Sequence, residues 1–273
     1  MPFLTVAGVD LHYVEHGPTA AEHTAVLLHG FPPDHRLMTG CFEPVFADRP
    51  GWRRLYLDLP GMGRTVAPDT IRGTDDVFAV VQAAVRQLVP DGRFALCGES
   101  YGGYLSRGLV AADPAAVTGL ALVCPMVIAD HAARDVPDHV VLYRDAFAAA
   151  LPRGTDFDAI AVVQTEETYA RTQREVVPGL TVADPAAVER ISRNYAGTFP
   201  LEPADRQYPG PTLFFLGRQD SSTGYRDPWQ ILEHYPHATF AVLDRAGHNA
   251  QIEQPALFSA LVSDWLDRVE QAN

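Results

Sequence analysis

The sequence contains no lysine, so its 21 basic residues are all arginines, and they are outnumbered by 34 aspartates and glutamates. The formal net charge of −13 makes an encounter with nucleic acid or with an anionic membrane surface unfavourable. Cysteine is scarce as well, and Cys41, Cys97 and Cys124 show no paired spacing, so we expect reduced, packed thiols. These deficits favour a small molecule as the partner.

Long hydrophobic runs are also missing. No stretch of about 18 apolar residues occurs, and the first residues, MPFLTVAGVDLHYVEHG, lack the features of a targeting segment. We therefore expect a cytoplasmic protein that does not bind membranes. Because 47% of its 273 residues are hydrophobic, the chain can still build a large core as one domain with an insertion. Both a monomer and a homodimer stay open.

Short apolar runs bounded by turn residues recur along the chain. The stretch FLTVAGVDLHYVEH predicts two strands around a glycine-containing turn. Further runs are AVLLHGF, RRLYLDLPG, FALCGES and LALVCP, followed near the C-terminus by PTLFFLG and ATFAVLD. Runs that are apolar throughout are typical of parallel strands covered on both faces, and amphipathic helical patterns lie between them. The sequence therefore predicts an α/β protein whose sheet uses both ends of the chain.

The pattern changes between about residues 126 and 205. Apolar residues over 140–151 have helical spacing, and Asp184 followed by Pro185 is typical of a helix start. We interpret this segment as a helical insertion between two strands. The predicted division is a core of residues 1–125 and 206–273 with an insertion of residues 126–205.

One turn in the core carries a candidate nucleophile. In FALCGESYGGYL, Ser100 lies where a predicted strand ends and a helix begins, and the sharp reversal leaves no room for side chains at Gly98 and Gly102. Such a turn holds the hydroxyl at the C-terminal edge of the sheet, where α/β proteins bind ligands. The N-terminus of the following helix points free N–H groups at any oxyanion formed there.

A serine hydroxyl is a poor nucleophile at neutral pH, so a base and a group that orients this base are needed. In RAGHNA, His248 follows the last predicted strand, and in GRQD, Asp220 follows the strand before it. Asp130 and Asp244 are alternative acids. We prefer Asp220, because Asp244 is only four residues from the histidine and is expected within the strand rather than at its end.

These motifs together resemble the α/β-hydrolase family over nearly the whole chain. GESYGG, LGRQD and AGHNAQIEQP match the family's nucleophile, acid and base positions at Ser100, Asp220 and His248. LLHGFP resembles the loop that completes the oxyanion hole, and LDLPGMGRT resembles a turn found in the family. The resemblance implies an eight-stranded, mostly parallel sheet with helices on both faces and a helical cap over the site.

The resemblance also implies the parts of the chemistry. Backbone N–H groups of Phe31 and Tyr101 would form the oxyanion hole, and neither a metal nor an organic cofactor is needed. Glu99 is close to the site in sequence, but we interpret it as a solvated or turn-stabilising carboxylate, like Asp34. Four aromatic residues of the cap could line a pocket, although their spacing is more typical of core residues. They are Tyr143, Phe147, Tyr169 and Tyr195.

The reaction itself is a hypothesis. The rim formed by Phe31 and the prolines after it favours hydrolysis of an ester, lactone or thioester of a small to medium apolar acid, as by a carboxylesterase. Three alternatives stay open: an aminopeptidase similar to proline iminopeptidases, with Glu166 and Glu167 holding an amine; a carbon–carbon bond hydrolase of ring-cleavage products, with cap arginines binding an acid; and a relative that only binds ligands. Epoxide hydrolases and haloalkane dehalogenases carry aspartate at the position of Ser100, which speaks against both.

Overall fold

A computed structural model describes residues 2–90 and 92–272 of the chain. Its centre is a sheet of eight strands in the order β1-β2-β4-β3-β5-β6-β9-β10. The pairs β1–β2 and β2–β4 are antiparallel, and all other neighbouring pairs in this sheet are parallel. The predicted eight-stranded, mostly parallel sheet is thus confirmed. The strands are β1 (Phe3–Val6), β2 (Val9–His16), β3 (His23–Leu28), β4 (Trp52–Leu57), β5 (Phe94–Glu99), β6 (Val117–Val123), β9 (Thr212–Gly217) and β10 (Ala238–Leu243).

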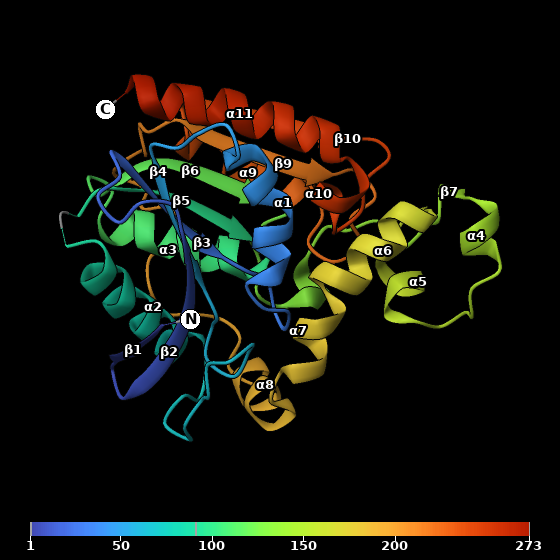
Figure 1. Ribbon diagram of the computed structural model, residues 1–273, viewed down its shortest axis with the longest axis horizontal. Helices are drawn as coiled ribbons and strands as arrows, with labels where there is room; N and C mark the ends of the chain where they lie inside the picture. The colour runs from blue at the N-terminus through green and yellow to red at the C-terminus, as the bar shows by residue number, and fades with distance from the viewer. Residues whose placement is uncertain (1, 91, 273) are drawn as a thin grey trace.

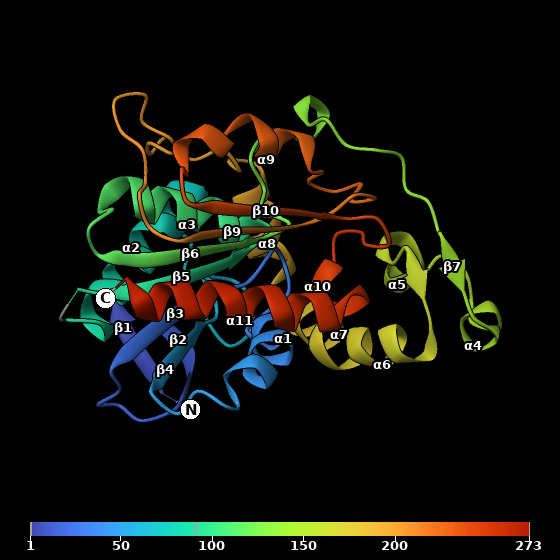
Figure 2. The ribbon, with the colours of Figure 1, turned by 90° about the horizontal axis from the view of Figure 1, so that it is seen from above.

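Helices cover both faces of the sheet (Figure 2). One face carries α2 (Thr74–Leu88), α3 (Tyr101–Ala112) and α9 (Arg226–Gln230), and the other carries α1 (Arg36–Phe46) and α11 (Pro255–Gln271). Successive side chains of a strand point to opposite faces, so an apolar strand contributes side chains to the core on each face of the sheet. In β3, Val26 and Leu28 pack toward α2 and α3, whereas Ala25 and Leu27 pack toward α1 and α11.

The C-terminal ends of the parallel strands meet at one edge of the sheet (Figure 1). Register brings Gly98 of β5 beside Leu28 of β3, and Glu99 beside Val123 of β6. The loops that follow β5, β9 and β10 therefore start close together, although they are far apart in sequence.

Between β6 and β9 the chain leaves the sheet for residues 124–211, which we call the insert. Its regular elements are η1 (His131–Ala133), β7 (Tyr143–Arg144), α4 (Ala146–Ala149), α5 (Asp156–Ile160), β8 (Val163–Gln164), α6 (Glu166–Glu175), α7 (Val177–Val182) and α8 (Pro185–Ser192). In Figure 1, β7, α4 and α5 form an arm that projects beyond the sheet edge, while α7 and α8 lie against the body. The boundaries predicted for a cap, residues 126–205, stay a prediction.

Two local expectations for the insert have different outcomes. The helix start at Asp184 is confirmed, because α8 begins at Pro185 and the Asp184 carboxylate accepts the N–H groups of the next two residues. The prediction of a helix over residues 140–151 is wrong. Tyr143 and Arg144 instead pair with β8, and the Arg144 guanidinium binds Gln164 and Asp158, so tertiary pairing overrides the spacing.

The remaining elements of the described chain are η2 (Leu232–His234) and α10 (Ala250–Glu253), which precedes α11. Across residues 2–90 and 92–272, none of the helices combines the length and the apolar character that crossing a bilayer would require.

Candidate active site

Ser100 occupies a strained turn between β5 and α3. Its backbone has φ 51° and ψ −113°, a conformation that costs a non-glycine residue of the order of 1–3 kcal/mol. Its N–H donates to the Val123 carbonyl at 3.0 Å, which ties the turn to β6. A side chain at Gly98 would collide with the Gly102 carbonyl, and one at Gly102 with the Leu28 carbonyl. The glycines therefore make room for a reversal that presents the Ser100 hydroxyl.

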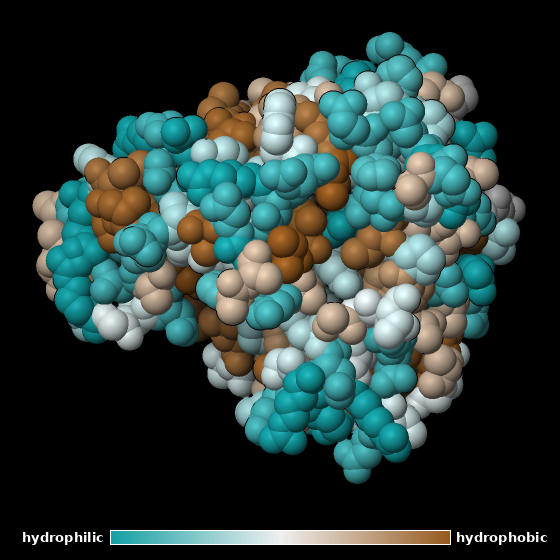
Figure 3. All heavy atoms as spheres, turned by 180° about the vertical axis from the view of Figure 1, so that it is seen from behind, coloured by the Kyte–Doolittle hydropathy of each residue, from teal (hydrophilic) through white to brown (hydrophobic). Residues whose placement is uncertain are grey.

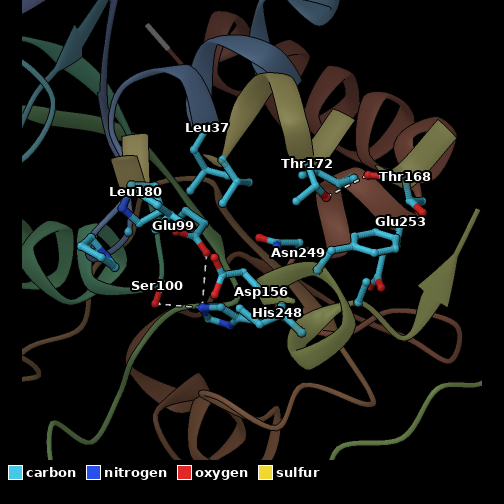
Figure 4. A pocket seen from close by; sticks show the side chains of 18 of the residues that line it. Leu37, Glu99, Ser100, Asp156, Thr168, Thr172, Leu180, His248, Asn249 and Glu253 are labelled. Atoms are coloured by element: carbon cyan, nitrogen blue, oxygen red, sulfur yellow. Dashed lines mark hydrogen bonds and ion pairs between the residues drawn. The ribbon is translucent and has the colours of Figure 1, made fainter. Parts of the chain in front are cut away.

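A chain of hydrogen bonds runs from this hydroxyl to a buried carboxylate. His248 Nε2 lies 3.0 Å from Ser100 Oγ, and His248 Nδ1 lies 3.0 Å from Asp220 Oδ2. Asp220 is fully buried; its Oδ1 accepts the N–H groups of Ser222 and Thr223, and its Oδ2 accepts the Thr223 hydroxyl at 2.7 Å. These donors fix the carboxylate against the imidazole. Figure 4 shows His248 reaching toward Ser100.

The charges at this site shift its proton affinities. Burial alone would lower the pKa of His248, but the charge and hydrogen bond of Asp220 and the charge of Glu99 outweigh it and raise this pKa to about 9. Burial would raise the pKa of Asp220, yet the nearby imidazolium and the hydrogen bonds from His248 and Thr223 lower it. Asp220 therefore stays ionised and stabilises a protonated His248, as a general base requires.

Glu99, the last residue of β5, faces the same imidazole. It is only 2% exposed, and its Oε1 lies 3.5 Å from His248 Nε2. Burial raises the pKa of Glu99 to about 7, against the lowering effect of the imidazolium. The interpretation of Glu99 as a solvated carboxylate is wrong, because its side chain is buried beside His248 and the Gly30 backbone. Asp34, by contrast, does stabilise its turn by accepting the Arg36 N–H.

The loop after β3 lies against the serine. A Cβ at Gly30 would collide with Glu99 Oε2 and come within 3.2 Å of Ser100 Cβ, so the loop can lie this close because residue 30 is glycine. His29 holds the loop: its Nδ1 lies 2.6 Å from the Gly30 carbonyl, and its Nε2 accepts the Leu59 N–H at 3.0 Å. Phe31 follows in this loop, and Tyr101 is the first residue of α3, where helical N–H groups have no intrahelical partner.

A narrow cavity of about 90 Å³ opens above Ser100. Most of its wall is apolar and comes from both the core and the insert. The lining residues are Gly30, Phe31, Pro32, Pro33, Leu37, Glu99, Ser100, Asp156, Phe157, Ile160, Ala161, Thr168, Thr172, Val176, Leu180, His248, Asn249, Ile252 and Glu253. The space-filling view in Figure 3 shows hydrophobic residues on the surface of the projecting arm and of the body beside it.

Comparison with known proteins agrees with this geometry. A family model described as alpha/beta hydrolase fold matches residues 26–255. The chain belongs to the α/β-hydrolase fold family. It is 26% identical over 235 residues, 81% of this chain and 82% of the relative, to a 2-hydroxymuconate semialdehyde hydrolase of Pseudomonas sp. (strain CF600).

Two solved structures of hydrolases are also similar to this chain. An alpha/beta superfamily hydrolase from Oenococcus oeni PSU-1 superposes with a TM-score of 0.86 at 26% identity, covering 95% of this chain and 96% of that one. The esterase RhEst1 from Rhodococcus sp. ECU1013 has a TM-score of 0.73 at 22% identity, covering 98% of both chains. The second likeness concerns the fold alone.

The other carboxylates proposed for this hydrolase from its sequence lie elsewhere. Asp130 caps η1 by accepting the Ala132 N–H. The expectation that Asp244 lies within the last strand is wrong, because β10 ends at Leu243 and Asp244 is exposed just beyond it. Glu166 and Glu167, considered as holders of an amine, are exposed in the first turn of α6 and are not among the described residues that line the cavity.

The insert contributes side chains that the sequence did not single out. Phe157, Ile160, Thr168, Thr172 and Leu180 line the cavity. The four aromatic residues considered instead are absent from the lining among the described residues. Tyr169 packs against both Phe147 and Phe157, and Tyr195 stacks on Tyr101. Tyr143 belongs to β7 in the arm. Rotation of the short insert helices decides which residues face inward, and no sequence motif reports that rotation.

Proposed function

We propose that this hydrolase cleaves a carboxylic ester, lactone or thioester with a small to medium, largely apolar acyl part. The observation that carries the proposal is the hydrogen-bonded series Ser100, His248 and Asp220 at the floor of an apolar cavity. A serine activated in this way attacks acyl carbonyl carbons. The apolar wall suits an alkyl or aryl group on the acyl side.

In the proposed reaction, Ser100 Oγ attacks the carbonyl carbon and its proton passes to His248 Nε2. The N–H groups of Phe31 and Tyr101 bind the oxyanion, and each such donor contributes about 3–4 kcal/mol. His248 then donates the proton to the leaving alcohol, which leaves an acyl group on Ser100. Water activated by the same imidazole hydrolyses this acyl-enzyme, while Asp220 keeps the ring oriented. These steps need neither a metal nor an organic cofactor.

The test combines labelling with turnover. A fluorophosphonate probe should label Ser100 in the folded protein, and 4-nitrophenyl esters of short alkanoic acids should be hydrolysed. Because the base must be uncharged, kcat/KM should increase with pH up to the pKa of His248, about 9. Ser100→Ala should abolish labelling and reduce kcat by about 10⁴-fold or more, whereas exposed Ser192→Ala should not. Full activity in Ser100→Ala would refute the proposal, and an unlabelled, inactive protein would favour a purely ligand-binding role.

The named Pseudomonas relative supports a second candidate, hydrolysis of a carbon–carbon bond in a ring-cleavage product. Such substrates are carboxylates, and the sequence offered arginines of the insert as their partners. None of the seven arginines in residues 126–205 lines the cavity, within the described part of the chain. The lining therefore favours the ester. A panel of aryl esters, proline amides and vinylogous diketones separates the candidates by which bond is cleaved.

A further inference from the structure

The charged groups that line the cavity have one sign. Glu99, Asp156 and Glu253 are carboxylates, and among the described lining residues none is an arginine. The chain has no lysine to supply a cation from elsewhere. The one group that can become cationic is His248, which already lies 3.0 Å from Ser100 Oγ and from Asp220 Oδ2. His248 must be neutral to act as the base in the proposed reaction, so a substrate anion would then find no positive partner among the described lining residues.

The three carboxylates differ in their freedom to meet a substrate. Glu253 is occupied, because its oxygens accept the backbone N–H groups of Val162, Val163 and Gly247. Asp156 is exposed at the N-terminal end of α5, where water screens its charge. Glu99 has fewer partners, the Gly30 backbone and the His248 imidazole, and it is buried beside the nucleophile, where a charge acts with little screening.

Two arginines close to the site, Arg134 and Arg171, are held by other groups. Arg134, whose charge acts on His248, donates to the backbone carbonyls of Ile128, Ala129 and Ser222. Arg171 binds Glu175 and the Gln251 carbonyl. Neither guanidinium lines the cavity, so neither cancels the charge of Glu99 for a bound molecule.

Figure 4 shows Glu99 and Ser100 joined to the same imidazole, so a group bonded to the carbon next to the attacked carbonyl comes within reach of the carboxylate. We propose that Glu99 makes the site selective for uncharged or cationic substrates, by accepting a hydrogen bond from an ammonium or hydroxyl group beside the scissile carbonyl and by repelling a carboxylate there. This inference rests on the proposed ester hydrolysis and specifies its substrate class.

The test uses three 4-nitrophenyl esters of one chain length: 2-hydroxybutanoate, butanoate and the half-ester of ethylmalonate. They place a hydroxyl, no polar group and a carboxylate at the same carbon. In the unmodified protein at pH 8, kcat/KM should fall in that order, with the carboxylate ester at least about tenfold below butanoate. Glu99→Gln should bring the three values closer together.

The readout is the ratio between esters, because any change in the basicity of His248 acts on all three alike. Glu167→Gln removes an equal charge from the exposed first turn of α6 and should leave the ratios unchanged. Fluorophosphonate labelling of Ser100 in Glu99→Gln checks that the variant is folded. Equal hydrolysis of the carboxylate and butanoate esters by the unmodified protein, or unchanged ratios in a labelled Glu99→Gln, would overturn the inference.

Failure of the proposed hydrolysis would look different, because none of the three esters would be cleaved. The charge preference is then measured by how strongly small molecules of different charge slow the labelling of Ser100 by the fluorophosphonate. 1-Butylamine and 1-butanol should protect better than butyrate, and Glu99→Gln should reduce that difference. Protection by butyrate equal to that by the amine would overturn the inference independently of turnover.

Discussion

The two walls of the cavity are held by different kinds of contact. On the sheet side, Ser100 and His248 follow strands whose positions are fixed by parallel hydrogen-bond ladders on neighbouring strands. On the insert side, α5, α6 and α7 are short helices, and the insert's own sheet pairs only two residues of β7 with two of β8. The sheet side therefore fixes the positions of Ser100, His248 and Asp220, while the insert side shapes the space above them.

Asp220→Asn tests the sheet side and should have the largest effect. The substitution keeps the shape of the side chain but offers His248 an amide, which favours the wrong tautomer, so kcat should fall about 10⁴-fold with little change in KM. Asp130→Asn and Asp244→Asn are matched controls, since both carboxylates are exposed and neither is the partner of His248 Nδ1. Steady-state kinetics on an aryl ester measure the difference. A loss in Asp244→Asn as large as in Asp220→Asn would mean that the acid has been assigned to the wrong strand end.

Much of the sheet side could be predicted from sequence. Ser100, Asp220 and His248 each follow an apolar strand, and parallel strands bring such positions to one edge without any knowledge of side-chain packing. Glu99 shows the limit of this reasoning. It precedes Ser100 in the same motif, but the motif does not specify which side chains pack around this position, so it does not tell whether Glu99 faces water or His248.

The insert could be predicted as mostly helical but not in detail. The apolar residues over 140–151 do have helical spacing. The chain there nevertheless pairs with β8, and the N–H groups of Leu142 and Tyr143 donate to the Val162 carbonyl. A helix as short as α4 gains little from its own hydrogen bonds, so tertiary contacts decide its structure. For the same reason, the insert residues that line the cavity could not be predicted from the sequence and are known only from the structure.

Glu253→Gln tests the hydrogen bonds that connect the insert side of the cavity to the sheet side, and its effect on kcat should be intermediate. The Glu253 carboxylate accepts N–H groups from Val162 and Val163 of the insert and from Gly247, the residue before His248. Burial raises its pKa to about 7, although these donors lower it. At pH 8 the amide nitrogen of glutamine would face these buried donors, so unfolding free energy should fall by about 1–3 kcal/mol.

The loss in Glu253→Gln should also reach the chemistry, because the loop that carries His248 loses an anchor. We expect kcat to fall about tenfold to a hundredfold, and urea denaturation to report the lower stability. Unchanged stability together with unchanged kcat would mean that the two sides of the cavity are held independently of Glu253.

Leu180→Ala tests the insert side alone and should have the smallest effect. Leu180 of α7 lines the cavity and packs against the small cluster of Leu37, Val176 and Ile252. Removing its branched end takes away contact with the far part of an acyl chain but leaves the Ser100 region untouched. The kcat/KM for a butanoate ester should therefore fall by about tenfold, while that for an acetate ester stays nearly constant.

Val182→Ala is the matched control for Leu180→Ala, since Val182 belongs to the same helix but is 51% exposed. It should leave both esters unaffected, because its side chain is not part of the cavity wall. An equal loss on acetate and butanoate in Leu180→Ala would show that α7 supports the reacting groups and not only the acyl chain. The two sides of the cavity would then act on the same step, and the division between a rigid sheet edge and a shaping insert would have to be given up.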